Sequence, residues 1–158
     1  MSTPFAAQDD IQSQRQGKAL VMTNGVFDIL HVGHLDFLLR AKALGDLLIV
    51  ALNDDESVRR LKGPSRPVNP LVERAALVLA LKPVDFVVSF NEDTPEAIIG
   101  QIKPDIHTKG GDYTVDQLPE AQIVKAYGGQ TVILPYLEGH STTRVVEALR
   151  AATLKPSS

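Results

Sequence analysis

Two histidines at a predicted strand–helix junction are the residues of this chain whose types and spacing point most clearly to chemistry. His31 and His34 lie three positions apart, with Gly33 directly before the second. They follow an apolar run, 19–22, that predicts a buried strand, and they precede residues 35–41, which have the apolar spacing of a helix. Such a junction in an α/β sheet binds phosphates, because free backbone N–H groups point at the anion. The pattern predicts a phosphate site.

The spacing of the histidines favours ligand binding over packing. Residues i and i+3 lie on one helix face, so His31 and His34 can present both rings to one object. Gly33 has no Cβ, which lets a bulky anion approach the backbone. An imidazole donates hydrogen bonds to phosphate oxygens and, when protonated, adds positive charge at a phosphoryl-transfer centre. The alternative is that the rings only cap or pack the first helical turn.

Two later segments carry residue types that also suit phosphates. Residues 139–144 precede a predicted helix, where Ser141 and Thr142 offer hydroxyls that cap the helix or bind a terminal phosphate. Residues 109–113 follow a predicted strand, and the paired glycines there permit a tight turn and a close backbone approach. The alternative for 109–113 is a plain turn.

A basic, proline-rich stretch lies between two predicted helical or strand segments. Residues 62–70 contain three prolines and a glycine, which excludes regular structure. Lys62 and Arg66 make this stretch basic, so we interpret it as a lid beside the phosphate site, with a solvated loop as the alternative. Arg74, in the helix that follows, either reaches the site or forms a surface salt bridge.

Three further polar residues have open or modest roles. Asp28 could orient a histidine, help to place a metal ion, or hydrogen-bond the turn, and the sequence does not separate these. His107 is predicted to be a strand residue and not a ligand. The role of His140 stays open between contacting the phosphates and shaping the loop.

The elements that must position these residues alternate along the chain. Apolar runs predict strands, helical patterns fall between them, and this alternation predicts an α/β, Rossmann-like, doubly wound sheet of about five parallel strands with helices on both faces. Loops at the carboxyl ends of such strands form one binding edge, to which the candidate residues belong. The strands are predicted at 20–23, 47–52, 86–89, 105–108 and 131–134, and the helices at 33–44, 70–81, 94–101, 116–127 and 141–152.

Size and composition narrow the class of protein. The 158 residues suit one domain, predicted at 17–154 and preceded by a flexible polar arm, 1–16. A net charge of −3 without a basic run argues against a nucleic-acid binder, and no apolar stretch is long enough to span a bilayer. The chain has no cysteine, so we expect neither disulfides nor thiolate metal sites, and we expect a cytoplasmic protein. P-loop and dinucleotide-binding glycine motifs are absent.

The histidine segment resembles the signature of the cytidylyltransferase-like nucleotidyltransferases, G-x-F-D-x-x-H-x-G-H, which residues 25–34 match without departure. Residues 52–58, 61–70, 109–113 and 138–143 are further similar to one branch, the D-glycero-β-D-manno-heptose 1-phosphate adenylyltransferases. The resemblance covers about residues 18–150. It implies ATP and a sugar 1-phosphate as substrates, with ADP-heptose for lipopolysaccharide core synthesis as the product.

The resemblance also implies roles for individual residues. With it, we predict catalytic contacts by His31, His34 and Lys62, and substrate contacts by Asp28, Asp112 and Arg74. No protein-bound metal is implied, because Mg²⁺ would be held through the ATP phosphates and water. The implied nucleotide contacts are Asn24, Gly25, Val26, Phe27, Gly33, Lys109, Gly110, Ser141 and Thr142.

Partners and rival functions complete these expectations. The resemblance implies a homodimer and, because many relatives are fused to a sugar kinase, a separate heptose kinase in the pathway. One alternative is a glycerol-3-phosphate cytidylyltransferase that uses CTP. An alternative of another class is a non-catalytic nucleotide sensor, and a fragment of a class I aminoacyl-tRNA synthetase is disfavoured because the chain has no K-M-S-K-S segment.

Overall fold

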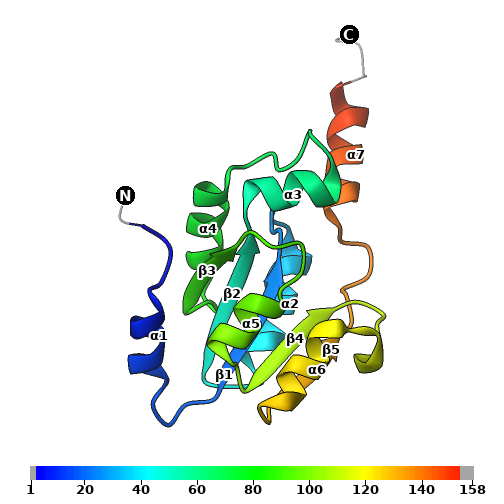
Figure 1. The fold of residues 1–158 in the computed structure, drawn as a ribbon. Helices are drawn as coiled ribbons and strands as arrows, with labels where there is room; N and C mark the ends of the chain where they lie inside the picture. The colour runs from blue at the N-terminus through cyan, green and yellow to red at the C-terminus, as the bar shows by residue number, and fades with distance from the viewer. Residues whose placement is uncertain (1–2, 154–158) are drawn as a thin grey trace.

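The computed structural model describes residues 3–153, which form a parallel sheet with helices on both faces (Figure 1). This confirms the predicted α/β, Rossmann-like class. The sheet has the strand order β3-β2-β1-β4-β5, and every pairing is parallel. The strands are β1 (Leu20–Gly25), β2 (Leu47–Asn53), β3 (Phe86–Phe90), β4 (Ile106–Gly110) and β5 (Gln130–Leu134).

Helices cover both faces of the sheet and bury a separate apolar cluster on each. One cluster includes residues of α1, α5 and α6, and the other includes residues of α2 and α4. Successive residues of β1 and β2 point to opposite faces, so these strands must be apolar on both sides. The helices are α1 (Gln8–Arg15), α2 (Val32–Lys42), α3 (Asp55–Lys62), α4 (Leu71–Leu79), α5 (Glu96–Ile102), α6 (Pro119–Ala126), α7 (Thr142–Thr153) and the short 3₁₀ helix η1 (Val115–Gln117).

The strand order reverses beside β1, and this point positions the site. From β1 the chain builds outward through β2 to β3, and it then returns to place β4 on the other side of β1 and β5 beyond it. In the strand register, Leu20 of β1 lies beside Leu47 of β2, and Val21 of β1 lies beside Ile106 of β4. The loops that follow β1, β2 and β4 therefore meet at one edge, which is where doubly wound sheets bind ligands.

The N-terminal segment differs from the predicted flexible arm. Residues 8–15 form α1, and Ile11 on this helix is 1% exposed within the cluster that α5 shares. The Arg15 guanidinium donates to the Ile102 carbonyl and pairs with Asp105 at 3.1 Å. The prediction was wrong for this helix because it has a single large apolar residue and hence almost no periodic signal.

The remaining boundaries differ little from prediction, with one exception. An unpredicted helix, α3, follows β2 and ends at Lys62, and the irregular stretch then runs over residues 63–70, as predicted to within one residue. The predicted C-terminal boundary, residue 154, lies outside the described residues. Within residues 3–153, no helix has the length and apolar character needed to cross a membrane.

Candidate functional site

The turn between β1 and α2 holds both histidine rings through the helix's own backbone. His31 is the N-cap of α2, and its Nδ1 accepts a hydrogen bond from the Gly33 N–H at 3.1 Å. The His31 N–H in turn donates to His34 Nδ1 at 3.2 Å, and the ring centroids lie 3.9 Å apart. Because each Nδ1 is an acceptor, each neutral ring carries its proton on Nε2. Capping thus occupies Nδ1 and leaves Nε2–H as the donor available to a ligand.

Burial keeps these rings neutral. It lowers the pKa of His34 to about 4, with a further contribution from the nearby His31. Burial also lowers the pKa of His31, and there the second cause is the charge of His140. Near neutral pH the pair therefore offers hydrogen bonds without formal charge, and the positive charge considered from the sequence would require an anion that raises both pKa values.

Close contacts around the turn explain its residue types. A Cβ on Gly33 would lie 2.9 Å from the His31 ring and 3.1 Å from the His140 Cβ, so a side chain there would displace the rings. Phe27 adopts a positive φ of 48°, which costs energy for a residue with a side chain. Its ring stacks at a tilt on His34, with centroids 5.2 Å apart. The turn is held in a strained conformation by its neighbours.

A cavity of about 660 Å³ opens over this turn and collects most of the predicted residues. It lies across the carboxyl ends of β1 and β4 and reaches the loops after β2, β3 and β5. Its lining includes all but two of the predicted site residues, namely Asn24, Gly25, Val26, Phe27, Asp28, His31, Gly33, His34, Lys62, Lys109, Gly110, Ser141 and Thr142. The two predicted residues that do not line it are Asp112 and Arg74.

The N-terminus of α7 approaches the histidine turn from the β5 side. Ser141 Oγ accepts the Arg144 N–H at 3.1 Å, which is an N-cap geometry. The Thr142 hydroxyl lies 3.5 Å from the Ile29 carbonyl oxygen. Ser141 and Thr142 both line the cavity. Capping and ligand binding again coexist, because the remaining N–H groups of the first turn have no intrahelical partner.

Asp28 binds the neighbouring loop through both of its carboxylate oxygens. Oδ2 accepts the Arg66 Nε–H at 2.7 Å and the Val68 N–H at 2.8 Å, while Oδ1 accepts the Asn69 N–H at 2.8 Å. Although burial alone would raise the pKa of Asp28, hydrogen bonds from Asn69, Val68 and Arg66 outweigh it and hold the pKa below its usual value. The structure thus shows Asp28 bonded to the loop 66–69, which matches none of the three roles considered from the sequence, and its predicted substrate contact stays a prediction.

Arg74 is a buried structural arginine, so its predicted substrate contact and the alternative of a surface salt bridge are both wrong. Its side chain is 0% exposed. It donates to the carbonyls of Val26, Asn53 and Asn69 at 2.8 to 3.0 Å, and it pairs with Asp55 at 2.8 Å. One guanidinium therefore ties together the ends of β1 and β2 and the loop that Asp28 binds.

Of the predicted contacts on the loop after β4, two line the cavity and one does not. Gly110 and Lys109 line the cavity, and the Lys109 ammonium lies 3.3 Å from the Glu120 carboxylate, which is 4% exposed at the start of α6. Asp112 lies on the exposed turn beyond them, outside the cavity lining, so its predicted substrate contact is not supported. The chain reaches the cavity again at Tyr113, which lines it.

Behind this loop, one hydrogen bond joins His107 to Asn24, for which the sequence made separate predictions. His107 lies in β4 and is fully buried, as the strand prediction requires. Its Nε2 lies 3.0 Å from Asn24 Oδ1, so the ring fixes the amide of a predicted nucleotide contact. His140, whose role was open, lines the cavity against Gly33.

Three charged lining residues, Arg66, Asp93 and Glu120, were not assigned a contact from the sequence. Arg66 reaches the cavity because Asp28 holds its Nε, and Glu120 reaches it from α6. The only sequence signal for Arg66 was its place in a basic stretch. Glu120 had no signal, since a carboxylate in a first helical turn usually only complements the helix dipole.

Carboxylates that face the cavity are already paired within the protein. Besides Asp28, Asp93 pairs with Arg60 at 2.8 Å and Glu120 pairs with Lys109. Among residues 3–153, no group of three or more His, Cys, Asp or Glu side chains is arranged to hold a metal ion. This donor set fits a divalent cation that arrives on substrate phosphates better than one bound directly by the protein.

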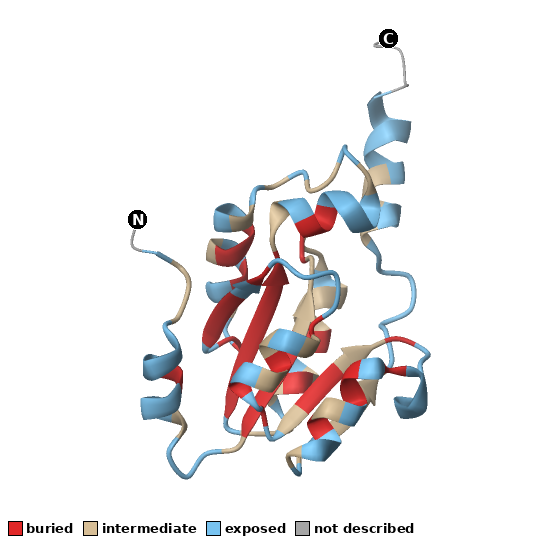
Figure 2. Cartoon of the chain, viewed as in Figure 1, coloured by how far each residue is buried: buried red, intermediate tan, exposed pale blue. Residues whose placement is uncertain are grey.

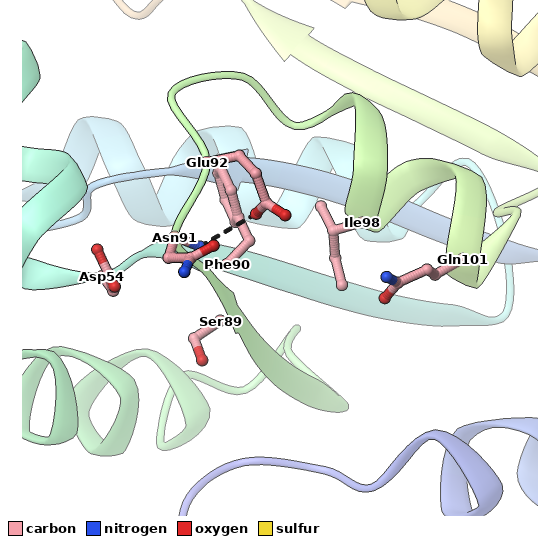
Figure 3. A pocket seen from close by; sticks show the side chains of 7 residues that line it. All are labelled: Asp54, Ser89, Phe90, Asn91, Glu92, Ile98 and Gln101. Atoms are coloured by element: carbon pink, nitrogen blue, oxygen red, sulfur yellow. Dashed lines mark hydrogen bonds between the residues drawn. The ribbon is translucent and has the colours of Figure 1, made fainter.

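A second, smaller cavity lies away from the histidines, between the end of β3 and α5 (Figure 3). Its volume is about 340 Å³, and its charged lining residues are the acidic Asp54 and Glu92. The Asn91 N–H donates to the Glu92 carboxylate at 3.2 Å. Because it has acidic but no basic lining residues, this cavity is unsuited to a polyphosphate, and none of the predicted site residues lines it.

Comparison with protein families and curated proteins gives matches over most of the chain. The cytidylyltransferase-like family matches residues 22–148. The bifunctional protein HldE of Alcanivorax borkumensis is 51% identical over 138 residues, which make up 87% of this chain and 29% of that protein. HldE of Azotobacter vinelandii is 54% identical over 135 residues, or 85% and 28% of the two chains. This chain thus spans about 29% of the length of such relatives.

A solved structure agrees with this grouping. The lipopolysaccharide core biosynthesis protein from Thermoplasma volcanium superimposes with a TM-score of 0.63 at 33% sequence identity. The match covers 78% of this chain and all of that one.

Proposed function

The chain belongs to the cytidylyltransferase-like family of nucleotidyltransferases, and on that premise we propose that it transfers the adenylyl group of ATP to a sugar 1-phosphate and releases pyrophosphate. The acceptor we propose is D-glycero-β-D-manno-heptose 1-phosphate, which gives ADP-heptose. Support comes from the HldE relatives, from the Thermoplasma protein named for lipopolysaccharide core biosynthesis, and from the similarity of residues 109–113 and 138–143 to the heptose branch.

The paired Nε2–H donors of His31 and His34 are the observation that carries this proposal. Their Nδ1 atoms are fixed by the backbone of α2, so the rings point without needing a ligand to orient them. Donors that are oriented in advance stabilise charge on phosphoryl oxygens at no reorganisation cost during the reaction. The same cavity holds the Lys62 ammonium and the free N–H groups of α7.

In the proposed reaction an oxygen of the acceptor phosphate attacks the α-phosphorus of ATP. A bond forms between that oxygen and phosphorus, the bond from phosphorus to the bridging oxygen breaks, and its electron pair leaves with pyrophosphate. Because the nucleophile is already an anion, no general base is required. The protein's task is to hold two anions in line and to stabilise charge on the phosphoryl oxygens.

The residues divide this task by position. His31 and His34 donate to oxygens of the reacting phosphate, Ser141 and Thr142 at the α7 N-terminus bind the leaving pyrophosphate, and Lys62 contacts the phosphates from α3. Asn24, Lys109 and Gly110 line the part of the cavity near β4 where we place the nucleoside. Mg²⁺ enters as part of the MgATP substrate. A sugar kinase that makes the acceptor is the partner activity this reaction needs, and the homodimer stays a prediction.

A panel of nucleoside triphosphates crossed with acceptor phosphates, read by pyrophosphate release, tests the proposal. We expect the highest kcat/KM with ATP and D-glycero-β-D-manno-heptose 1-phosphate. Turnover of CTP with glycerol 3-phosphate, and none with the proposed pair, would assign the chain to the cytidylyltransferase alternative. Binding of ATP without pyrophosphate release for any acceptor would favour the nucleotide sensor.

A further inference from the structure

The cavity extends to both sides of β1, and the two sides differ in charge. On the β4 side the one ammonium, Lys109, is paired with the buried Glu120. On the β2–β3 side the lining carboxylates Asp28 and Asp93 are paired with Arg66 and with Arg60, and Arg60 lies outside the lining. Lys62 also lines this side, and it has no carboxylate partner among residues 3–153. Net positive charge therefore faces the cavity on the β2–β3 side.

Arg66 is held in place on that side by one edge of its guanidinium. Its Nε donates to Asp28 at 2.7 Å, and the Asp28 side chain is 1% exposed. The two Nη groups have no acceptor within residues 3–153, and the Arg66 side chain retains 23% exposure at the cavity wall. A guanidinium fixed at Nε in this way presents its free nitrogens to a planar or tetrahedral anion.

Asp28 fixes not only the guanidinium but the loop that carries it. It accepts the N–H groups of Val68 and Asn69, and the Asn69 side-chain amide donates back to the Asp28 carbonyl at 2.7 Å. The Arg74 Nε–H donates a hydrogen bond to the carbonyl of Asn69 at 3.0 Å. The loop 63–70 is therefore anchored to the histidine turn at the position of Arg66, which departs from the freely moving lid suggested by its composition.

We propose that Arg66 binds the phosphate of the acceptor substrate, and that Asp28 is the positioning residue that aims it. This inference rests on the proposed nucleotidyl transfer. An in-line displacement places the nucleophile and the leaving group on opposite sides of the α-phosphorus. Ser141 and Thr142, assigned to the leaving pyrophosphate, stand at the start of α7, which follows β5, whereas Arg66 stands on the loop between α3 and α4, where Asp28 holds it. The two groups therefore reach the one cavity from different segments of the chain.

Substitution of Arg66 by Gln tests the assignment with the fold preserved, because the Gln amide can still donate to Asp28. We expect R66Q to raise the KM for D-glycero-β-D-manno-heptose 1-phosphate by about 10- to 100-fold, the range for loss of a charge-assisted hydrogen bond. The KM for ATP should stay within about twofold, because nothing on the β4 side changes. Arg66→Lys, which keeps the charge but loses the fork, should fall between these values.

Arg59→Gln is the matched control, since Arg59 is an exposed arginine of α3 outside the cavity lining. It should leave both KM values unchanged. An R66Q variant that weakens ATP as much as the acceptor, or that leaves the acceptor KM within twofold, would overturn the assignment.

Calorimetry separates failure of this inference from failure of the proposed function. The titrant is the heptose 1-phosphate, added to protein saturated with a non-reactive ATP analogue. If the wild type shows no turnover yet binds the sugar phosphate, and R66Q weakens that binding at least tenfold, the anion site stands and the transfer reaction does not. If R66Q binds as the wild type does, or the wild type fails to bind, the inference is wrong.

The role of Asp28 has its own readout. Asp28→Asn should raise the acceptor KM without changing the ATP KM, and in the double variant with R66Q the effect should not exceed that of R66Q alone, because both act through one guanidinium. A D28N variant with additive effects, or with an effect on ATP alone, would show that Asp28 does not act through Arg66. Should D28N fail to fold, the R66Q and R66K comparison still decides the assignment of Arg66.

Discussion

On the β1–β2 side of the cavity the binding groups follow strands that are mostly or fully buried, whereas on the β5–α7 side they follow a strand with no buried residue and begin a helix with none (Figure 2). Every residue of β2 is buried, and the buried Arg74 joins the ends of β1 and β2. In α7, no described residue is buried, and the helix projects away from the sheet (Figure 1).

This difference indicates two ways of holding a phosphate group. The histidine side is organised in advance by packing and by hydrogen bonds that no ligand has to make. The α7 side offers good donors, Ser141 and Thr142, but few contacts hold their helix. We therefore expect substitutions near β1 and β2 to affect stability or catalysis strongly, and substitutions on the outer part of α7 to affect neither.

Removal of Arg74 should have the largest effect. Arg74→Ala leaves three backbone carbonyls, one of them buried, and the Asp55 carboxylate without their donor. Breaking a buried ion pair from one side costs about 3–5 kcal/mol, so the free energy of unfolding should fall by about that amount. Urea unfolding followed by circular dichroism measures the loss. A change below about 1 kcal/mol would mean that the β1–β2 side is not held as described.

The control for Arg74 is an arginine in an exposed pair. Arg60→Ala removes the surface bridge to Asp93, and surface pairs are screened by water and salt. It should produce no measurable loss of stability. Equal losses for the two variants would remove the contrast between buried and exposed arginines.

His31→Asn should separate capping from catalysis at the histidine turn. Asn is a good N-cap and can accept the Gly33 N–H, so stability should stay within about 1 kcal/mol of the wild type. The variant lacks the Nε2–H donor, and loss of one such donor lowers kcat about 10²- to 10³-fold. Pyrophosphate release and thermal unfolding, measured on the same preparation, provide the two readouts. An active H31N would show that His31 only caps α2.

The sequence predicted the sheet and most of the cavity because those features are local. Buried parallel strands are short apolar runs, and the glycine and histidine spacing of the turn lies within ten residues. Helix α1 was missed because Ile11 gives no period. The partners of Asp28 and Arg74 were not predicted because most of them come from other loops and strand ends. They lie 38 to 41 residues away for Asp28 and as far as 48 residues away for Arg74. Charged residues near a site look alike in a sequence, whether they face the ligand or the framework.

Lowering the pH should reduce the free energy of unfolding through the rings of His34 and His107, which lie in different surroundings. Burial lowers the pKa of both His34 and His107 to about 4, against 6.5 in an unfolded chain. The folded state therefore binds fewer protons, and the stability present above pH 6.5 is lost as the pH falls towards 4. For the fully buried His107 the shift corresponds to as much as about 3 kcal/mol. Unfolding free energies measured from pH 7 to pH 4 should fall accordingly.

A titration followed by NMR distinguishes the two rings. A non-reactive ATP analogue with Mg²⁺ should raise the pKa of His34, which lines the cavity, and leave that of His107 unchanged, because His107 is bonded to Asn24 behind the cavity wall. If His34 titrates near 6.5 without nucleotide, the neutral-donor description of the turn is incorrect.

Leu149→Ser on α7 should have the smallest effect, and it tests the other half of the comparison. Leu149 is 61% exposed, so its replacement removes little buried apolar surface, and the free energy of unfolding should change by less than about 0.5 kcal/mol. Pyrophosphate release should also be unchanged, since the cavity meets α7 only at its first turn. A loss above about 1 kcal/mol would mean that α7 packs on another surface in solution. Sedimentation of wild type and L149S would then show whether a second copy of the chain provides that surface.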